Sequence, residues 1–283
     1  MSDGAPHPGD PDRAVLLLVD IQPDFVPGGA LPVEGGDEIL EPVARLMEEG
    51  PFRLQVATQD WHPPGHVSFA SQHPGRGPMD VIELHGHDQT LWPDHCVQGT
   101  DGAELHPHLP WDRVEAVLRK GTSRESDSYS GFRNNWGPGG ERRPTGLAGY
   151  LREREIERVY VCGLARDVCV RWTAEDAADA GFETWVLWDL CRSVDPSGDG
   201  ALRTALDERG VGILDPTDLS AGGGEERPAS PEAAAAREAG PETGPVPGRP
   251  TDKEPHPGKG EGRKANVQRA PADQRARPDP DQR

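Results

Sequence analysis

Short apolar runs alternate with amphipathic segments along the first 220 residues of the chain. Five runs rich in Val, Leu and aromatic residues have the length of β-strands, at 14–19, 53–58, 114–119, 157–162 and 183–188. Helical patterns of apolar positions lie near 37–49, 146–154, 167–180 and 197–209. Alternating strands and helices are typical of a mainly parallel sheet covered on both faces. The pattern therefore predicts an α/β domain of three layers, α/β/α.

The composition changes sharply after residue 220. From 221 onward the chain is rich in Gly, Pro and charged residues, and its only aliphatic residues larger than alanine are Val246 and Val267. So little apolar surface does not offset the entropy lost when a chain becomes ordered. We therefore expect a disordered tail at 221–283, a folded domain at 14–220 and a flexible, proline-rich N-terminus at 1–13.

The predicted domain has a strong excess of negative charge. The chain has 30 Lys and Arg against 49 Asp and Glu, which gives a net charge of -19. The segment 221–283 contains 11 of each sign, so the whole excess falls on residues 1–220. Because such a surface repels nucleic acids and anionic membranes, we expect neither as a partner. A small-molecule substrate is the favoured ligand.

Two features bear on the cellular compartment. The longest early apolar run, 14–19, is too short for a signal sequence or a membrane span. Four cysteines, at 96, 162, 169 and 191, form no CxxC pair, as expected for free thiols in a reducing compartment. We therefore expect a cytoplasmic protein. The sequence does not fix its oligomeric state, and a homo-oligomer stays open.

The segment 159–170, which reads VYVCGLARDVCV, places a cysteine near the start of a predicted helix. Its strand-like part breaks at Gly163, and the helical pattern that follows contains Cys169. Unpaired N–H groups and the helix dipole favour a thiolate at such a position. The same donors stabilise the oxyanion that forms when sulfur attacks a carbonyl group. The sequence therefore predicts that Cys169 is a nucleophile.

Reactive side chains follow four of the five predicted strands. Asp20 follows the first strand, Asp60 and His62 the second, Lys120 the third, and Cys169 the fourth. Ligands of open parallel sheets bind outside the carboxyl ends of the strands, so these side chains are expected to meet. Each one alone also fits a structural role, such as a turn cap or a buried thiol. Their coincidence at four strand ends favours a catalytic site.

Asp20 and Lys120 have the chemistry that a cysteine nucleophile needs beside it. An aspartate takes the thiol proton and later returns it to a leaving amine. A lysine stabilises the thiolate and keeps the aspartate ionised. We therefore expect Asp20 to transfer the proton and Lys120 to supply the positive charge.

A second chemistry is indicated by Asp60 and His62, which project to the same side of an extended chain. Aspartate and histidine together suit zinc, iron or manganese. His95 is the expected third ligand, and His66 is a candidate for a fourth contact or a supporting hydrogen bond. The sequence thus predicts one divalent metal ion. The remaining histidines are interpreted as solvated or structural: His73, His85, His87, His106 and His108.

The interval between Trp61 and Trp111 reads as a long loop, because it is rich in His, Pro and Gly. Loops of this length in compact domains are usually functional or disordered, and the histidines favour a functional one. A further Gly- and Pro-rich insertion lies near 136–144.

Several separated motifs occur in one order along the chain. They are VDIQPDF at 19–25, TQDWHP at 58–63, WPDHCVQGT at 92–100, Lys120-Gly121, DSYSGF at 127–132 and GLARDVCV at 163–170. Together they resemble the nicotinamidase/pyrazinamidase branch of the isochorismatase-like cysteine hydrolases, from about residue 14 to about residue 216. The resemblance implies an isochorismatase-like fold with a six-stranded, mainly parallel sheet. Neither the insertion near 136–144 nor the tail is explained by it.

The resemblance also assigns roles to individual positions. It implies a catalytic triad of Asp20, Lys120 and Cys169, and metal ligands Asp60, His62 and His95, with His66 where some members have an additional metal-associated histidine. It implies a cis peptide between Leu164 and Ala165, so that the N–H groups of Ala165 and Cys169 form an oxyanion hole. Phe25, Trp92 and Tyr129 would enclose the substrate ring.

The activity implied by the resemblance is the hydrolysis of nicotinamide to nicotinate and ammonia through a cysteine thioester. This reaction belongs to NAD salvage, and pyrazinamide is a further expected substrate. Three alternatives stay open. The first is another amidohydrolase of the superfamily that acts on a carbamoyl or ureido substrate. The second is a zinc hydrolase in which Asp60, His62 and His95 hold an activated water and Cys169 is idle. The third is a small-molecule or protein-binding module without activity.

Overall fold

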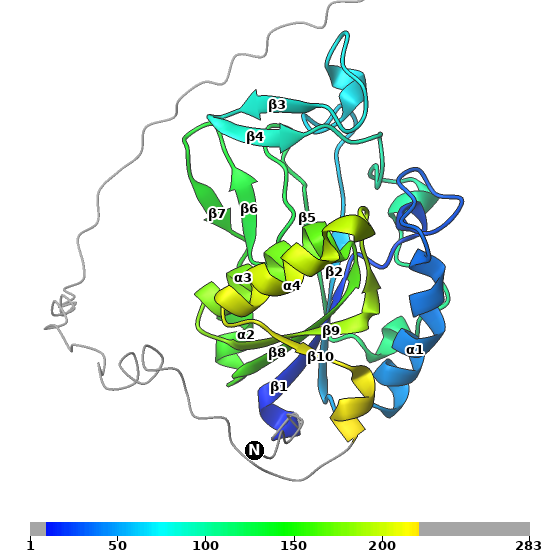
Figure 1. Ribbon diagram of the computed structural model, residues 1–283, viewed down its shortest axis with the longest axis vertical. Helices are drawn as coiled ribbons and strands as arrows, with labels where there is room; N and C mark the ends of the chain where they lie inside the picture. Colours follow the sequence, from blue (N-terminus) through cyan, green and yellow to red (C-terminus); the bar gives the residue numbers. More distant parts are fainter. Residues whose placement is uncertain (1–9, 221–283) are drawn as a thin grey trace, which may run out of the picture. The chain divides into compact units, whose positions relative to one another are not determined.

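Figure 1 shows the computed structural model of the chain, which describes residues 10–220. The predicted tail at 221–283 and most of the predicted flexible N-terminus lie outside the described residues. Pro11–Arg13 form a short 3-10 turn, capped by the side chain of Asp10, directly before the first strand. Regular structure is therefore already present directly ahead of position 14.

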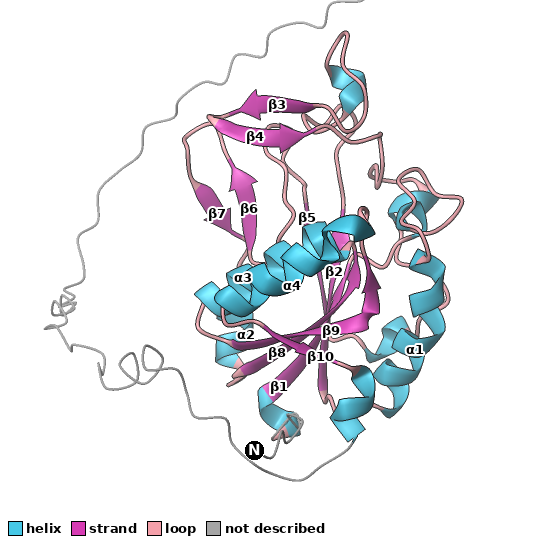
Figure 2. Ribbon diagram, in the orientation of Figure 1, coloured by secondary structure: helices cyan, strands magenta, loops and turns pink. Residues whose placement is uncertain are grey.

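A six-stranded parallel sheet forms the centre of the described residues, with the strand order β10-β9-β8-β1-β2-β5 (Figure 2). Its strands are β1 (Ala14–Val19), β2 (Leu54–Asp60), β5 (Ala116–Lys120), β8 (Arg158–Leu164), β9 (Glu183–Arg192) and β10 (Gly212–Leu214). All residues of β1 and β2 are buried, as expected for strands covered on both faces. The six-stranded parallel α/β fold is confirmed, and β10 is the one strand of this sheet that the apolar pattern did not mark.

Helices cover both faces of this sheet (Figure 2). They are α1 (Leu40–Glu49), α2 (Leu147–Glu153), α3 (Arg171–Asp179) and α4 (Asp199–Glu208). The chain moves toward one edge of the sheet through α1 and toward the other through α2, α3 and α4. Right-handed crossovers therefore place α1 on one face and the other three on the opposite face. No helix among the described residues is long and apolar enough to span a membrane.

Two small antiparallel hairpins lie beyond the carboxyl ends of the parallel strands (Figure 1). The strands β3 (Val81–Leu84) and β4 (His87–Thr90) lie in the interval expected to be a loop. The strand β6 (Arg133–Trp136) ends where the Gly- and Pro-rich insertion near 136–144 begins, and β7 (Arg142–Pro144) lies within it. The rings of His87 and Trp136 stack with their centroids 3.8 Å apart, which connects the two hairpins. The interpretation of 61–111 as a loop is therefore wrong for β3 and β4.

Candidate active site

The ammonium group of Lys120 is the centre of a buried cluster at the carboxyl ends of β1, β2 and β5. Its Nζ lies 2.9 Å from Asp20 Oδ2, 3.0 Å from Asp60 Oδ1 and 3.5 Å from the Cys169 sulfur. It also donates a hydrogen bond of 2.8 Å to the carbonyl of Ser128. The structure therefore brings together the three residues predicted as the triad, and adds Asp60 to them.

Charge and burial oppose each other in this cluster. Burial disfavours the charged form of Lys120, but Asp20 and Asp60 outweigh it and hold the lysine pKa well above its usual range. Burial acts in the opposite direction on Asp20 and raises its pKa, partly offset by Lys120. The Asp60 carboxyl is also buried, yet His62 and Lys120 hold its pKa well below the usual value. The cluster thus combines a firmly charged lysine with one aspartate that accepts a proton readily.

Burial raises the pKa of the Cys169 thiol well above its usual value, although Lys120 acts to lower it. The expectation that the helix start favours a resting thiolate is therefore wrong in direction. The thiol is buried beside two carboxylates, and their charges add to the effect of burial. Deprotonation of the sulfur must then be part of the reaction, with a base in contact.

Cys169 lies in a π-helical turn, Arg166–Val170, that precedes the regular turns of α3. The Leu164–Ala165 peptide before it is cis, as the resemblance implied. The N–H groups of Val168 and Val170, on either side of Cys169, both donate to the carbonyl of Ala165, at 3.2 and 3.0 Å. The predicted position of the cysteine near a helix start is confirmed, with a wider first turn than an α-helix has.

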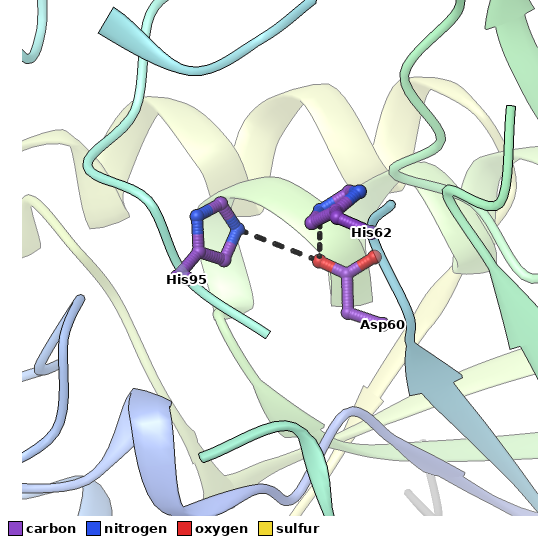
Figure 3. Close-up of side chains that lie close together, drawn as sticks. All are labelled: Asp60, His62 and His95. Atoms are coloured by element: carbon purple, nitrogen blue, oxygen red, sulfur yellow. Dashed lines mark hydrogen bonds and ion pairs between the residues drawn. The ribbon is translucent and has the colours of Figure 1, made fainter. Parts of the chain in front are cut away.

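Asp60, His62 and His95 form a second group, shown in Figure 3. Asp60 Oδ2 lies 3.1 Å from His62 Nε2 and 3.6 Å from His95 Nε2. Through its other oxygen, Asp60 contacts Lys120. All three side chains are buried, and one ligand atom of each lies within 4.8 Å of the others. The predicted metal ligands therefore meet at one point.

The hydrogen bonds of the two imidazoles decide what this point can bind. His62 Nδ1 lies 3.0 Å from the carbonyl oxygen of Gly121, and His95 Nδ1 lies 2.7 Å from that of Pro93. A carbonyl only accepts, so in the neutral ring Nδ1 has the proton and Nε2 presents a lone pair. Two lone pairs and a carboxylate oxygen then converge. This donor set fits a divalent cation such as zinc, iron or manganese.

His66 lies beside this group but faces another way. Its ring centroid is 4.2 Å from that of His62, while its Nδ1 lies 2.7 Å from the Ser68 hydroxyl and its Nε2 lies 3.3 Å from the Ser126 carbonyl oxygen. Burial lowers its pKa to about 4, so the ring is neutral. With His62 and Asp127 it makes a second group of possible ligands. Its role as a fourth ligand stays a prediction.

A small pocket connects the thiol and the metal-ligand group. Both the nucleophile and two predicted metal ligands line it, together with the three predicted aromatic residues and Ala165: Phe25, Trp92, Tyr129, Asp60, His95 and Cys169. Tyr129 is held by hydrogen bonds that its hydroxyl accepts from Trp92 (3.1 Å) and Gln89 (2.8 Å). Aromatic side chains beside a few polar groups are the lining that suits a small aromatic molecule.

Four further residues line the pocket and were not singled out in the sequence: Leu31, Asp127, Val168 and Val194. The three aliphatic residues have no functional group that sequence reasoning could single out. Asp127 lies within the DSYSGF motif at 127–132 but outside the expected ligand set. None of the histidines interpreted as solvated or structural lines this pocket or belongs to a ligand group among the described residues: His73, His85, His87, His106 and His108.

Gly121 leaves the space that the His62 ring occupies. A Cβ at this position would lie 2.4 Å from His62 Cε1, and the backbone φ of +65° is itself unfavourable for other residues. We expect Gly121→Ala to displace the ring and to weaken metal binding about 10- to 100-fold, as loss of support for a ligand typically does. Competition with a chelator of known affinity measures this.

Gly181→Ala is the matched control, because Gly181 has a similar φ of +89° with nothing within 4 Å of the added Cβ. It is expected to retain the metal affinity of the wild type. Unchanged affinity in Gly121→Ala would argue against His62 as a ligand.

Comparison with known proteins places the chain among enzymes of one family. The family model described as Isochorismatase domain matches residues 14–216. The nicotinamidase of Acinetobacter baylyi is 46% identical over 187 residues, which are 66% of this chain and 85% of that protein. The structure of PnC1 from L. infantum in complex with nicotinate has a TM-score of 0.65 and 41% identity, and covers 74% of this chain and 96% of that chain. The pyrazinamidase of Pyrococcus horikoshii in complex with zinc has a TM-score of 0.57 and 38% identity, and covers 72% of this chain and 99% of that chain.

Proposed function

The chain belongs to the isochorismatase family, and we propose that within this family it is a nicotinamidase, an amidohydrolase that converts nicotinamide to nicotinate and ammonia. One observation carries the proposal beyond the similarity. One pocket is lined by Cys169 and by the metal-ligand residues Asp60 and His95. Behind it, Lys120 contacts the sulfur and the carboxylate of Asp20, and Asp60 contacts both Lys120 and His62. An aromatic amide with a ring nitrogen fits both ends of this site: its ring nitrogen suits the metal-ligand end, and its carboxamide suits the thiol end.

The metal-ligand end would orient the ring. Asp60, His62 and His95 would hold a divalent ion, which supplies a Lewis-acid contact for the pyridine nitrogen when bound. Phe25, Trp92 and Tyr129 would enclose the ring and exclude water, leaving the carboxamide over Cys169. The relative from Pyrococcus horikoshii with zinc supports a metal here. Metal analysis of the purified protein distinguishes zinc, iron and manganese.

The thiol end would carry out the chemistry. Asp20 takes the proton of Cys169, and the sulfur attacks the carboxamide carbon while Lys120 keeps the aspartate in place. The N–H groups of Ala165 and Cys169 stabilise the oxyanion, an effect typically worth about 3 kcal/mol per donor. The C–N bond then breaks, and ammonia leaves with the proton from Asp20.

A thioester between Cys169 and the nicotinoyl group remains after ammonia has left. Asp20, again a carboxylate, removes a proton from water, and the resulting hydroxide attacks the thioester carbon. The C–S bond breaks, nicotinate leaves, and the sulfur regains its proton. The buried position of Lys120 between Asp20 and Asp60 keeps the geometry of both ends fixed during these steps.

Residues 14–220 are proposed as the hydrolase domain, in agreement with the family match over 14–216. The four free cysteines among the described residues support a cytoplasmic location. A homo-oligomer is compatible with these features.

The function is tested by measuring ammonia and nicotinate released from nicotinamide by the full, metal-loaded protein. Equal amounts of both products are expected, and pyrazinamide is expected to be deamidated as well. N-carbamoyl substrates serve as the comparison, because other members of the superfamily have the same triad. Activity confined to the carbamoyl compounds would replace the proposed function with that alternative.

A further inference from the structure

The hydroxyl of Thr58 makes two hydrogen bonds to one residue, Asp20. Thr58 lies on β2, and Asp20 follows the neighbouring strand β1. The backbone N–H of Asp20 donates to Thr58 Oγ1 at 3.2 Å, and Thr58 Oγ1 lies 2.7 Å from Asp20 Oδ1. Both residues are completely buried. The threonine is outside the triad and the metal-ligand group described above.

The acceptor fixes the direction of the second hydrogen bond. A carboxylate oxygen only accepts, so the Thr58 hydroxyl donates its proton to Asp20 Oδ1. Its oxygen accepts at the same time from the Asp20 amide. Asp20 Oδ1 is occupied by the threonine, while Oδ2 faces the ammonium of Lys120 at 2.9 Å. The two oxygens of the carboxylate thus have different partners: Oδ1 accepts from the Thr58 hydroxyl, and Oδ2 contacts the Lys120 ammonium.

Packing and backbone conformation keep this arrangement fixed. A Cβ on Gly131 would lie 2.9 Å from Thr58 Cγ2, so the methyl group packs closely against the Gly131 backbone and the hydroxyl is held toward Asp20. Asp20 itself has a φ of +48°, which few non-glycine residues adopt. The hydrogen bond from its N–H to Thr58 stabilises that conformation directly at the strand end.

We propose that Thr58 is a positioning residue for the reaction: it holds the Asp20 carboxylate so that Oδ2 is the oxygen that receives the proton of Cys169. This inference rests on the proposed function. The threonine contacts the base only, so it orients the proton transfer without touching the substrate pocket, which it does not line. It is thereby expected to affect the chemical step and leave substrate binding intact.

A purely structural role of the Thr58 hydroxyl predicts that its loss has the same effect as the loss of any other buried threonine hydroxyl. Buried threonines commonly satisfy their hydroxyl with a nearby carbonyl, as Thr184 on β9 does by donating to Phe182 at 3.0 Å. Thr184 is nearly as buried as Thr58 and also lies on a strand of the sheet, away from the pocket. The same substitution at both positions therefore separates a general cost of losing a buried hydroxyl from a specific effect on Asp20.

The experiment measures kcat and KM for nicotinamide in Thr58→Val, Thr58→Ser and Thr184→Val, prepared as full-length, metal-loaded proteins. Loss of a hydrogen bond to a charged group predicts a fall in kcat of about 10- to 100-fold in Thr58→Val, with KM changed less than about twofold. Thr58→Ser keeps the hydroxyl and should recover most of the rate. Thr184→Val should have the wild-type kcat.

A wild-type kcat in folded Thr58→Val overturns the inference. A Thr58→Ser variant that is as slow as Thr58→Val also overturns it, because the hydroxyl would then not be the group that matters. Circular dichroism checks the fold, and Thr58→Ala, which removes the hydroxyl without adding bulk, gives the same reading if the valine variant is unfolded. A wild-type protein that does not hydrolyse nicotinamide overturns the proposed function itself, and this inference with it.

Discussion

Replacing Cys169 with alanine is expected to lower kcat for nicotinamide by about four orders of magnitude or more, the loss typical of removing a covalent nucleophile. The sulfur lies 3.5 Å from Lys120 Nζ and lines the pocket, and no other thiol of the described residues does so. The metal-ligand group does not include it, so metal content should be unchanged. Ammonia release and metal analysis on the same preparation measure both quantities.

Cys162→Ala is the control for this variant. Cys162 is as buried as Cys169 and belongs to the strand that leads to the nucleophile turn, but it lies in the core. Its loss should reduce stability modestly and leave kcat within a few-fold of the wild type. Near-normal turnover in Cys169→Ala would instead favour the metal hydrolase with an idle cysteine that the sequence left open.

Removal of the buried cation is expected to have the largest effect on stability. Lys120→Met keeps most of the side-chain length but leaves the carboxylates of Asp20 and Asp60 buried without their partner. Breaking a buried ion pair from one side typically costs about 3–5 kcal/mol, so the free energy of unfolding should fall by about this amount. Urea unfolding measures it, and nicotinamide hydrolysis should be lost as well.

The matched control is Arg209→Met, which breaks the exposed pair with Asp179. Its atoms lie 3.2 Å apart, with side-chain exposures of 50% and 57%. Exposed pairs are usually worth less than about 1 kcal/mol, so the unfolding curve should barely move. Equal, small effects of the two substitutions would show that the Lys120 cluster is not a network of buried charges.

The positions of the catalytic candidates were accessible to sequence reasoning because the fold is parallel. Asp20, Asp60 and Lys120 directly follow or end apolar strands, and parallel strands end at the same edge of a sheet. Their places at the ends of parallel strands were thus sufficient to predict that these three side chains meet. Asp60 directs one carboxylate oxygen toward Lys120 and the other toward the imidazoles. This division depends on side-chain rotamers, which no sequence pattern encodes.

Other features could not be predicted for identifiable physical reasons. The strand β4, His87–Thr90, consists of polar residues and is stabilised by pairing with β3 across a tight turn, so its apolar pattern is weak. The strand β10 has three residues only. The expected thiolate at Cys169 was argued from the helix terminus and the charge of Lys120, whereas burial beside two carboxylates raises the pKa of the thiol. Burial is a property of the assembled fold, which local sequence does not contain.

Covalent catalysis by Cys169 is tested most directly by mass spectrometry of the full-length, metal-loaded protein, quenched in acid during turnover of nicotinamide and digested into peptides. We expect a nicotinoyl group on the peptide that contains Cys169, which disappears once the substrate is consumed and is absent from the Cys169→Ala variant. Release of nicotinate with Cys169 unmodified at every time point, or with the label on another residue, would contradict it.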